Sequence, residues 1–487
     1  MSITKANKVT CPSGASRAAW VLPALAASLA LTLTAPVTAQ TFTTLYSFTA
    51  VNPNTLVNSD GAGPVAGLVF SGNTLYGTAN QGGSSGWGTV FAVSTDGTEF
   101  TTLYSFTGGS DGGRTLAGLV LSGKTLYGTA LEGGTGAGTV FAVNTDGTGF
   151  TTLYSFGNGS DGANPSAGLV LSGNTLYGTA LGGSGWGTVF AVNTDGTGFT
   201  TLYSFTAGAI NSLGLITNSD GATPKAGLVL SGNTLYGTAY YGGSSGRGTV
   251  FAVNTDGTGF TTLHAFVGGD DGANPGAAGL IISGNTLYGT AFTGGSSGRG
   301  TVFAVNTDGT GFTTLHSFLG GDDGANPRAG LILSGNTLYG TAAGGGTSGN
   351  GTVFAINTDG TGFTTLYSFT AKSGLFNSDG AYPVASLILS GDTLYGTANE
   401  GGSSGQGTVF SLSLPAVSAP QLTITPSGAN VILTWSASAT GFTLQSTTNL
   451  GPLASWTTNS PAPVVVNGQN VVTNPISGAQ QFFRLGQ

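Results

Sequence analysis

Residues 117–156 read AGLVLSGKTLYGTALEGGTGAGTVFAVNTDGTGFTTLYSF, and this stretch decides the fold. It holds four short segments rich in β-branched and aromatic residues, separated by clusters of Gly, Asn, Asp and Ser: 117–123, 124–130, 138–145 and 149–156. Segments of this composition and length are typical of β-strands. The SGN-type and NTDGTG connections supply the positive-φ residues that tight hairpins need. The stretch therefore predicts a four-stranded antiparallel meander.

The same unit recurs along the chain. TLYG occurs seven times, with its tyrosine at Tyr76, Tyr127, Tyr177, Tyr236, Tyr288, Tyr339 and Tyr395. GTVF also occurs seven times, and so does a TTL element followed by Tyr or His. No segment after residue 40 has helical periodicity. We expect an all-β protein built from seven copies of one sheet.

The two ends of the repeat array indicate how the copies assemble. Each sheet is apolar on both faces, so neighbouring copies must cover it, and radial repetition of four-stranded units gives a β-propeller. Residues 42–48, FTTLYSF, are a fourth strand without the first three, while the seventh copy ends at residue 415 without a fourth strand. We expect residues 40–414 to form a seven-bladed β-propeller in which the N-terminal strand completes the last blade and leaves no open edge.

The first 39 residues differ from the rest. Lys5, Lys8 and Arg17 precede the apolar run AWVLPALAASLALTL, and VTA ends at Ala39, a pattern typical of a cleavable secretory signal. We therefore expect the protein to be secreted or displayed at the cell surface. Cys11 is the only cysteine and lies in this leader, so the mature chain would have no disulfide, cysteine nucleophile or thiolate metal site.

Charge and hydropathy exclude further classes of function. The net charge is −8, with 11 Lys and Arg against 19 Asp and Glu, and such a surface repels phosphate backbones. We therefore expect no nucleic-acid partner. After the leader no run of about 18 apolar residues occurs, so the mature chain is predicted to have no membrane span.

The C-terminal part has a different composition. Residues 415–420 contain two prolines and are predicted to be a linker. Residues 421–487 contain six or so short strand-like segments, with Trp435 and Trp456 as expected core aromatics. This pattern predicts an immunoglobulin- or fibronectin-III-like β-sandwich, a module that serves as a spacer or as an adhesive unit.

The units SGNTLYGTA, GTVFAVNTDGTGF and TTLYSF resemble the glycine-rich tandem repeats called GloVer repeats, which occur in exported bacterial proteins of the choice-of-anchor type. The resemblance covers residues 41 to about 414. It implies an exported, propeller-like repeat protein, and it brings no established catalytic residues. No hydrophobic sorting tail is visible at the C-terminal end of the sequence.

The two histidines occupy a repeated position. His264 and His316 stand where the other five copies have Tyr46, Tyr104, Tyr154, Tyr203 and Tyr367. A catalytic base needs oriented partners, and nothing in this element supplies them. We therefore expect both histidines to have a packing role.

Differences between the copies are concentrated in two loops, which would emerge on one face of the ring. The differing side chains there include the residues proposed to bind a ligand, namely Trp87, Trp186, Tyr240, Tyr241, Arg247, Phe292 and Arg299. Trp, Tyr and Arg are enriched at binding hot spots, which favours a surface for an extracellular glycan or a surface protein. Neutral drift in glycine loops, with both tryptophans folded onto their blades, explains the variation equally well.

Seven aspartates, each followed by Gly, precede the predicted first strands: Asp60, Asp111, Asp161, Asp220, Asp271, Asp323 and Asp379. A ring of carboxylates could attract a cation such as Ca²⁺. Asp-Gly is also ordinary turn chemistry, and one carboxylate per blade does not make a cage of six to eight oxygens. The turn role is favoured, so we expect no metal and no cofactor.

The sequence offers no paired catalytic groups. Glu132 and Glu400 are the off-pattern acids on the divergent face, but a blade separates them, and no free histidine is left for a Ser-His-Asp triad. We therefore predict a non-enzymatic exported scaffold for binding or adhesion. A purely structural envelope component and a polysaccharide-active enzyme are the alternatives.

Overall fold

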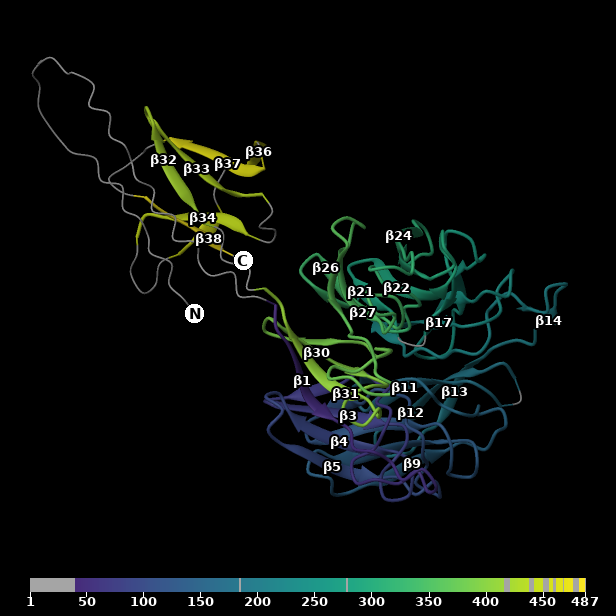
Figure 1. The fold of residues 1–487 in the computed structure, drawn as a ribbon. Helices are drawn as coiled ribbons and strands as arrows, with labels where there is room; N and C mark the ends of the chain where they lie inside the picture. Colours follow the sequence, from purple (N-terminus) through teal and green to yellow (C-terminus); the bar gives the residue numbers. More distant parts are fainter. Residues whose placement is uncertain are drawn as a thin grey trace, which may run out of the picture. The chain divides into compact units, whose positions relative to one another are not determined.

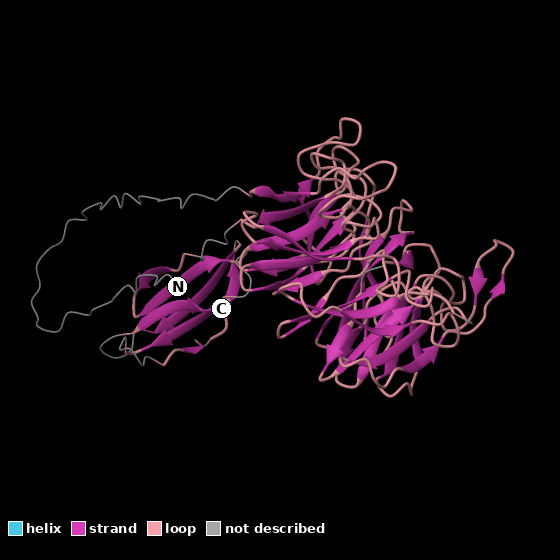
Figure 2. Cartoon of the chain, turned by 90° about the horizontal axis from the view of Figure 1, so that it is seen from below, coloured by secondary structure: helices cyan, strands magenta, loops and turns pink. Residues whose placement is uncertain are grey.

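The computed structural model describes residues 40–183, 185–276, 279–415, 421–437, 442–449, 455–458, 461–466, 468–475 and 481–486. These residues form strands and turns, and none of them is helical (Figure 2). The predicted signal peptide, Cys11 and most of the predicted linker lie outside them. The chain divides after Leu414 into a repeat unit, which begins at Gln40, and a C-terminal unit, which begins at Pro415 (Figure 1).

Six sheets of the repeat unit are formed by consecutive strands, each hydrogen-bonded antiparallel to the next, as the sequence predicts. The strands of the first three sheets are β2 (Val69–Ser71), β3 (Thr74–Ala79), β4 (Thr89–Ser94) and β5 (Phe100–Ser105); β6 (Val120–Ser122), β7 (Thr125–Ala130), β8 (Thr139–Asn144) and β9 (Thr151–Ser155); β10 (Val170–Ser172), β11 (Thr175–Ala180), β12 (Thr188–Asn193) and β13 (Thr200–Ser204).

The fourth, fifth and sixth sheets repeat this order. Their strands are β16 (Val229–Ser231), β17 (Thr234–Ala239), β18 (Thr249–Asn254) and β19 (Thr261–Ala265); β21 (Ile281–Ser283), β22 (Thr286–Thr293), β23 (Thr301–Asn306) and β24 (Thr313–Ser317), with β20 (Ala273–Pro275) also on β22; β25 (Ile332–Ser334), β26 (Thr337–Ala342), β27 (Thr352–Asn357) and β28 (Thr364–Ser368). Between the third and fourth sheets, β14 (Ala209–Ile210) and β15 (Ile216–Thr217) form a small hairpin.

The seventh sheet joins the two ends of the repeat unit. It contains β29 (Ile388–Ser390), β30 (Thr393–Ala398) and β31 (Thr408–Ser413), and its fourth strand is β1 (Phe42–Ser47). Phe42 pairs with Leu412 and Ser47 with Thr408. The N-terminal strand therefore occupies the position that the incomplete copies at the two ends predict for it.

The first strand of each sheet is shorter than the sequence predicts. In the second sheet only Val120–Ser122 pairs, although the predicted strand spans residues 117–123. The preceding Ala-Gly segment instead approaches the same segment of the previous repeat. A Cβ on Gly118 would lie 3.2 Å from the carbonyl oxygen of Gly67. The backbone is thus turned toward its neighbour and cannot continue the ladder.

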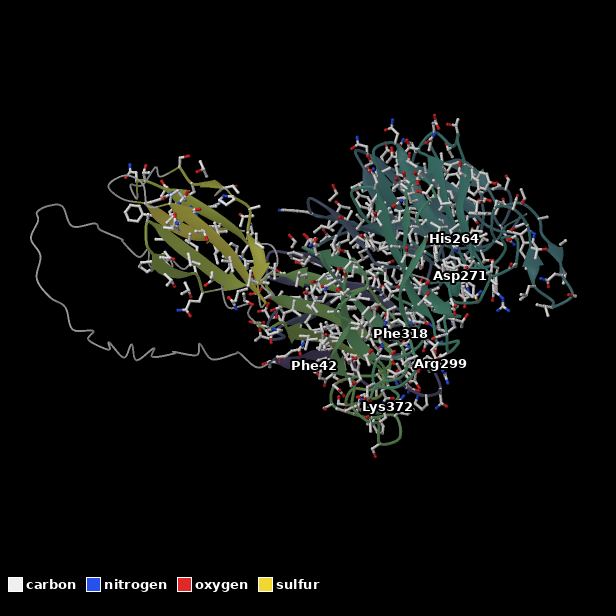
Figure 3. The ribbon with its side chains drawn as sticks, turned by 90° about the horizontal axis from the view of Figure 1, so that it is seen from above. Phe42, His264, Asp271, Arg299, Phe318 and Lys372 are labelled. Atoms are coloured by element: carbon white, nitrogen blue, oxygen red, sulfur yellow. The ribbon has the colours of Figure 1, made fainter. Side chains whose placement is uncertain are left out.

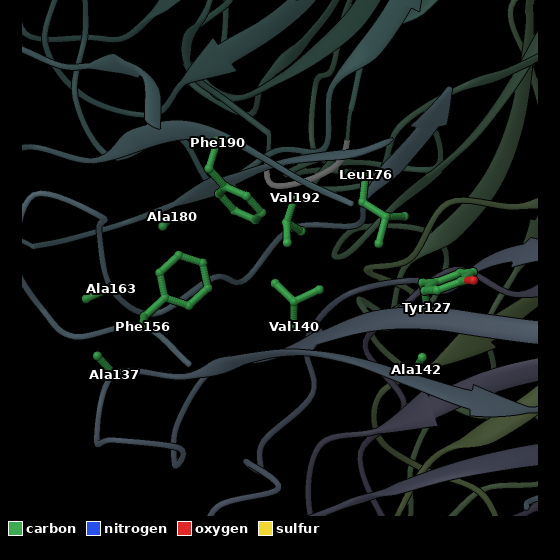
Figure 4. Close-up of a cluster of buried hydrophobic side chains, with 10 residues drawn as sticks. All are labelled: Tyr127, Ala137, Val140, Ala142, Phe156, Ala163, Leu176, Ala180, Phe190 and Val192. Atoms are coloured by element: carbon green, nitrogen blue, oxygen red, sulfur yellow. The ribbon is translucent and has the colours of Figure 1, made fainter. Parts of the chain in front are cut away.

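Apolar cores lie between consecutive sheets. Figure 4 shows one of them, in which Val140 and Phe156 of the second sheet meet Phe190 and Val192 of the third. The four side chains are completely buried, and burial of one such side chain stabilises the fold by about 1.5–3 kcal/mol. A similar core joins Phe48 and Val409 of the seventh sheet to Phe91 of the first. Contacts between neighbouring sheets therefore also link the last sheet to the first.

The TLYG motif needs its glycine for a steric reason. Gly77 on β3 pairs with Phe91 on β4, and a Cβ at Gly77 would lie 2.5 Å from Phe91 Cζ. Real Cβ atoms do not come this close to another carbon. The glycine therefore makes room for the phenylalanine of GTVF, which is why the two motifs recur together.

The C-terminal unit has two sheets. One contains β32 (Thr423–Ser427), β33 (Asn430–Ser436), β37 (Gln469–Pro475) and β36 (Val464–Val466), and the other contains β35 (Thr457–Thr458), β34 (Thr443–Thr447) and β38 (Phe482–Gly486). Trp435 is buried as predicted, in a core with Leu444 and Phe483 of the other sheet. Trp456 is half-buried, and the guanidinium of Arg484 lies 4.3 Å from its ring centroid.

Across the described ranges, no helix has the length and apolar character needed to cross a membrane.

Candidate functional site

A cavity of about 570 Å³ is lined by all seven repeats. The lining segments lie just before the first strand of each sheet, and residues at the ends of three second strands add to them. The lining includes Val65–Leu68, Leu116–Leu119, Ser166, Gly168, Leu169, Lys225, Gly227, Leu228, Gly279, Arg328 and Val384–Ser386, together with Leu131, Leu181 and Asn399. The volume is within the range of small-molecule pockets.

Hydrogen bonds between repeats hold the cavity wall in place. In six repeats the threonine of TLYGT donates its hydroxyl to a carbonyl of the next repeat's Ala-Gly segment, at 2.9–3.2 Å: Thr78 to Ala117, Thr129 to Ala167, Thr179 to Ala226, Thr290 to Ala329, Thr341 to Ala385 and Thr397 to Ala66. The last of these bonds connects the seventh repeat to the first. Since both groups are buried, each bond satisfies a donor and an acceptor that water does not reach.

The backbone of the wall repeats, but its side chains do not. The residue before each Ala-Gly or Ala-Ser pair projects from the same place in six repeats and differs among them: Val65, Leu116, Ser166, Lys225, Arg328 and Val384. The fourth and sixth repeats therefore contribute cations, whereas the first, second and seventh contribute apolar side chains. The positive charges of the cavity wall are thus confined to two repeats and are not spread over the whole wall.

Aromatic rings support the two cations. Lys225 Nζ lies 4.2 Å from the ring centroid of Tyr240, and Arg328 Cζ lies 4.5 Å from that of Phe292. Burial, and then the neighbouring charge of Arg328, lowers the pKa of Lys225 below its ordinary value. The two cations are therefore close enough to repel each other, and cation–π contacts hold them in place.

The predicted site residues fall into two groups. Tyr240 and Phe292 lie against the cations of the cavity, and Tyr241 packs edge-to-face on Tyr240 with 38% of its surface exposed. Trp87, Arg247 and Arg299 lie farther along the loops, over glycines of the following repeat: Gly108, Gly268 and Gly320. Arg299 is labelled in Figure 3.

Both tryptophans lie partly buried in the scaffold. Trp87 packs on the core between the first and second sheets, and the guanidinium of Arg114 lies 5.5 Å from its ring. Trp186 packs on the core between the third and fourth sheets and lines a second cavity of about 500 Å³ with Ser160 and Ser204. Tyr240 and Phe292 therefore contact the cations of the first cavity, and Tyr241 packs on Tyr240, but none of the three lines the cavity. The two tryptophans do not line it either.

The seven aspartates form the second predicted constellation, and each is bonded to the preceding fourth strand. Asp60, Asp111, Asp161, Asp220 and Asp379 accept from the hydroxyls of Tyr46, Tyr104, Tyr154, Tyr203 and Tyr367, while Asp271 and Asp323 lie 3.2 Å from Nε2 of His264 and His316. Backbone amides also donate to them, for example Thr206 N to Asp220 at 2.7 Å. The carboxylates hold turns, which is the role that the Asp-Gly pattern favours.

The two histidines pack between aromatic rings. His264 stacks on Phe312 at 3.7 Å and meets Phe266 edge-on, and His316 makes the same contacts with Phe363 and Phe318. Burial lowers the pKa of both imidazoles, and the facing aspartates oppose this shift only in part. Figure 3 labels His264 and Asp271. The ring packing agrees with the role predicted from the repeated Tyr position, but each imidazole also has an oriented aspartate partner, which the sequence did not predict.

None of the residues that line the cavity was among the predicted site residues, and the lining residues that were not predicted include Ser166, Lys225 and Arg328. The signal was available, because the residue before Ala-Gly varies between copies as much as the loops do. Within the described ranges no group of three or more His, Cys, Asp or Glu is arranged to hold a metal ion.

The model of the Gloeobacter/Verrucomicrobia repeat matches residues 31–218, 206–410 and 269–448. The chain belongs to this family. The match covers the whole described repeat unit, so the GloVer resemblance read from SGNTLYGTA and GTVF is confirmed. No curated protein is similar to this GloVer-repeat chain.

Solved structures with a similar arrangement have low sequence identity. They include an oligogalacturonate lyase in complex with manganese (12% identity, 77% of this chain and 93% of that one, TM-score 0.46). They also include TolB from Acinetobacter baumannii, with 11% identity over 71% of this chain and 78% of that one (TM-score 0.36). A further match is a nidogen/laminin complex, with 16% identity over 58% of this chain and 90% of that one (TM-score 0.38). At these scores the likenesses say nothing about activity.

Proposed function

We propose that this GloVer-repeat protein is an exported, non-enzymatic binding scaffold. Its repeat unit is a closed seven-bladed β-propeller that takes a ligand into the cavity lined by all seven repeats. The C-terminal unit is an immunoglobulin- or fibronectin-III-like sandwich that acts as a spacer. The leader of residues 1–39 directs export, so the partner is an extracellular molecule: a glycan, a surface protein or a smaller compound.

Contacts between the last and the first repeat support the closed ring. Gly63 N donates to Gln406 O at 2.9 Å, and the equivalent bond joins Arg114 N to Trp87 O at 2.8 Å within the array. The buried bond from Thr397 to Ala66 repeats the pattern of Thr78 and Ala117. The seventh repeat thus meets the first through the same bonds that join successive repeats.

The observation that carries the binding proposal is the difference between the cavity's backbone and its side chains. Stability requires the same backbone and hydrogen bonds in every repeat, and the wall keeps them. Nothing in the scaffold requires Ser166, Lys225 and Arg328 at equivalent places, yet all three line one cavity of ligand size. Rigid scaffolds that present unequal side chains are where recognition is commonly placed.

The histidine contacts favour binding over catalysis. Each imidazole is stacked on a phenylalanine and faces one aspartate, at a position that tyrosine fills in five other repeats. Tyrosine could not replace a general base at neutral pH, because its pKa is far above that of histidine. The position is therefore selected for a flat ring that reaches the aspartate.

A cavity-filling substitution tests the proposed function. Val65 lines the cavity and Val267 is an exposed loop residue, 60% accessible, so Val65→Trp and Val267→Trp form a matched pair. We expect ligand-observed NMR with a fragment library to detect compounds that bind the parent and Val267→Trp but not Val65→Trp. Binding that survives in Val65→Trp, or a parent that binds no fragment, would overturn the proposal and favour a structural envelope role.

Two further measurements address the remaining alternatives. Binding to a glycan array that is lost in a Trp87→Ala/Trp186→Ala double variant would place the ligand on the outer loops, with Arg247 and Arg299 beside it. Release of products from a panel of polysaccharides, lost in Glu132→Gln or Glu400→Gln, would show a polysaccharide-active enzyme.

A further inference from the structure

Lys225 and Arg328 lack an acidic partner, as do Lys124, Arg247, Arg299 and Arg484 among the described residues, but only Lys225 and Arg328 line the cavity. The sequence has 19 Asp and Glu against 11 Lys and Arg. Arg114 pairs with Glu132 at 3.4 Å, and Lys372 pairs with Glu400 at 2.7 Å. Among the described residues, no carboxylate lies within 4.0 Å of the charged nitrogens of Lys225 or Arg328. Two unpaired cations in one wall are therefore a local positive site on an acidic protein.

A third polar group of the wall also lacks a partner. Ser166 Oγ is buried and has no hydrogen bond within the part of the chain that the structure describes. A buried hydroxyl without a partner costs free energy, so its presence calls for an explanation. Ser166 lines the same cavity as Lys225 and Arg328. Because the Oγ atom is covered, the side chain must turn about its Cα–Cβ bond before its hydroxyl can donate to an acceptor in the cavity.

Most of the remaining side chains of the wall are apolar, and Ser386 and Asn399 are the polar exceptions. Val65, Leu116, Leu131, Leu181 and Val384 line it, and all five are half-buried. A sugar ring carries hydroxyls on every side, and these side chains cannot hydrogen-bond to them. A cation already lies over one face of Tyr240 and over one face of Phe292, so neither of these faces is free to stack on a sugar. The wall fits an apolar body better than a carbohydrate.

We propose that the cavity binds an organic anion with an apolar body, whose carboxylate is held by Lys225 and Arg328 while its body lies against Leu116, Leu131 and Leu181. The inference rests on the proposed function, because it assigns a ligand class to the same cavity. The carboxylate would reduce the repulsion between the two cations, and a turn of the Ser166 side chain would bring its hydroxyl to the carboxylate oxygens. Charge-assisted bonds of this kind are about twice as strong as neutral ones.

Matched probes test the charge. In calorimetric titration of the purified chain we expect 4-phenylbutyrate to bind at one site, and 4-phenylbutanamide, which has the same body without the charge, to bind about tenfold or more weakly. Equal affinity for the two would overturn the inference but leave the cavity a binding site. Absence of binding by the acid would also overturn it, and the fragment library would then decide the proposed function independently.

Matched variants test the residues. We expect Lys225→Gln/Arg328→Gln to reduce affinity for the acid to that for the amide, and Lys124→Gln/Arg484→Gln, which removes the same two charges elsewhere, to leave it unchanged. A thermal unfolding midpoint near the parent's shows that the first variant is folded. If it unfolds early, Ser166→Ala and the single variants replace it, with a smaller loss expected for each. Unchanged affinity in the folded variants contradicts the assignment.

A third probe tests the apolar body. Glucuronate carries a carboxylate on a sugar ring, and we expect it to bind more weakly than 4-phenylbutyrate. Tighter binding of glucuronate would overturn the apolar part of the inference and indicate an acidic sugar.

Discussion

The aspartate positions and the cavity wall are both repeated around the array, yet only the aspartates keep the same side chain. All seven aspartates accept a bond from a Tyr or lie against a His of the preceding fourth strand. At the cavity wall the equivalent position is Val, Leu, Ser, Lys, Arg or Val in six repeats. Positions that hold the sheets together are uniform because every repeat solves the same packing problem. Positions that do not hold the sheets together can differ between repeats, and these differences indicate which ligand the cavity could bind.

The largest effect is expected when the uniform framework is broken at its junction. Removal of residues 40–48 deletes β1, leaves β31 with an unpaired edge and takes Leu45 and Phe48 out of a buried core. Loss of one buried phenylalanine side chain alone costs about 3–5 kcal/mol. We expect the truncated chain to lose more than this in its free energy of unfolding, as measured by urea titration.

Deletion of residues 209–217 is the control for that truncation. It removes hairpin β14–β15, of similar length, whose Ile210 and Leu213 are about three-quarters exposed. We expect little change in the urea midpoint. Equal midpoints for the β1 truncation and the parent would mean that the stability of the repeat unit does not depend on its N-terminal strand.

A smaller effect is expected at a single aspartate. Asp220 is buried and accepts bonds from Tyr203 Oη, Thr206 N and Thr206 Oγ1 at 2.6–2.9 Å. Asp220→Ala leaves these donors without their acceptor, so we expect a loss of about 1–3 kcal/mol in the free energy of unfolding. Binding in the cavity should be unchanged, since Asp220 is not part of its wall.

Asp256→Ala is the matched control for that substitution. Asp256 lies in an exposed hairpin and accepts from Thr258 alone. We expect its urea midpoint to fall by less than that of Asp220→Ala. A larger loss at Asp256 would contradict the assignment of the buried aspartates as the uniform framework.

The sequence predicted the framework well because the framework is what repeats. Seven copies of TLYG and GTVF show the strand order, and the unmatched FTTLYSF shows which strand completes the last sheet. The bond from Tyr or His to Asp was not predicted. The two residues are 7 positions apart in four repeats but 14, 17 and 12 apart in the other three, so one spacing does not hold throughout. Only the folded turns bring them to one place.

The cavity was not predicted for a different physical reason. Residues 117–119 were predicted to be part of the first strand of the second sheet. Leu116 was therefore expected to precede that strand and not to line a cavity. Close approach of Gly118 to Gly67 turns this segment inward, and such an approach depends on the neighbouring repeat. Local pattern cannot show it. The loops, where variation is conspicuous, therefore drew the predicted site toward Trp87 and Trp186.

The smallest effect is expected where the framework itself varies, at the two histidines. Burial lowers the pKa of His264 and His316 below 6.5, so between 6.5 and the folded-state value the unfolded chain binds more protons than the folded chain. Stability contributed by neutral imidazole is therefore complete above about pH 6.5 and decreases as the pH falls through the folded-state pKa. We expect His264→Tyr/His316→Tyr to flatten this part of the pH profile of the urea midpoint.

The reciprocal variant strengthens that test. Tyr104 and Tyr154 occupy the same position in two other repeats, and burial, with the facing aspartates, raises their pKa to about 12, so they stay neutral throughout the acid range. Tyr104→His/Tyr154→His should therefore steepen the decline below pH 6.5. Hairpin carboxylates cannot mimic the effect, because hydrogen bonds lower the pKa of Asp96 to about 2 and those of its counterparts below their usual value. A parent and a double tyrosine variant with the same slope between about pH 6.5 and pH 5 would show that the two histidines bind protons equally in the folded and unfolded chain, which contradicts a pKa lowered by burial.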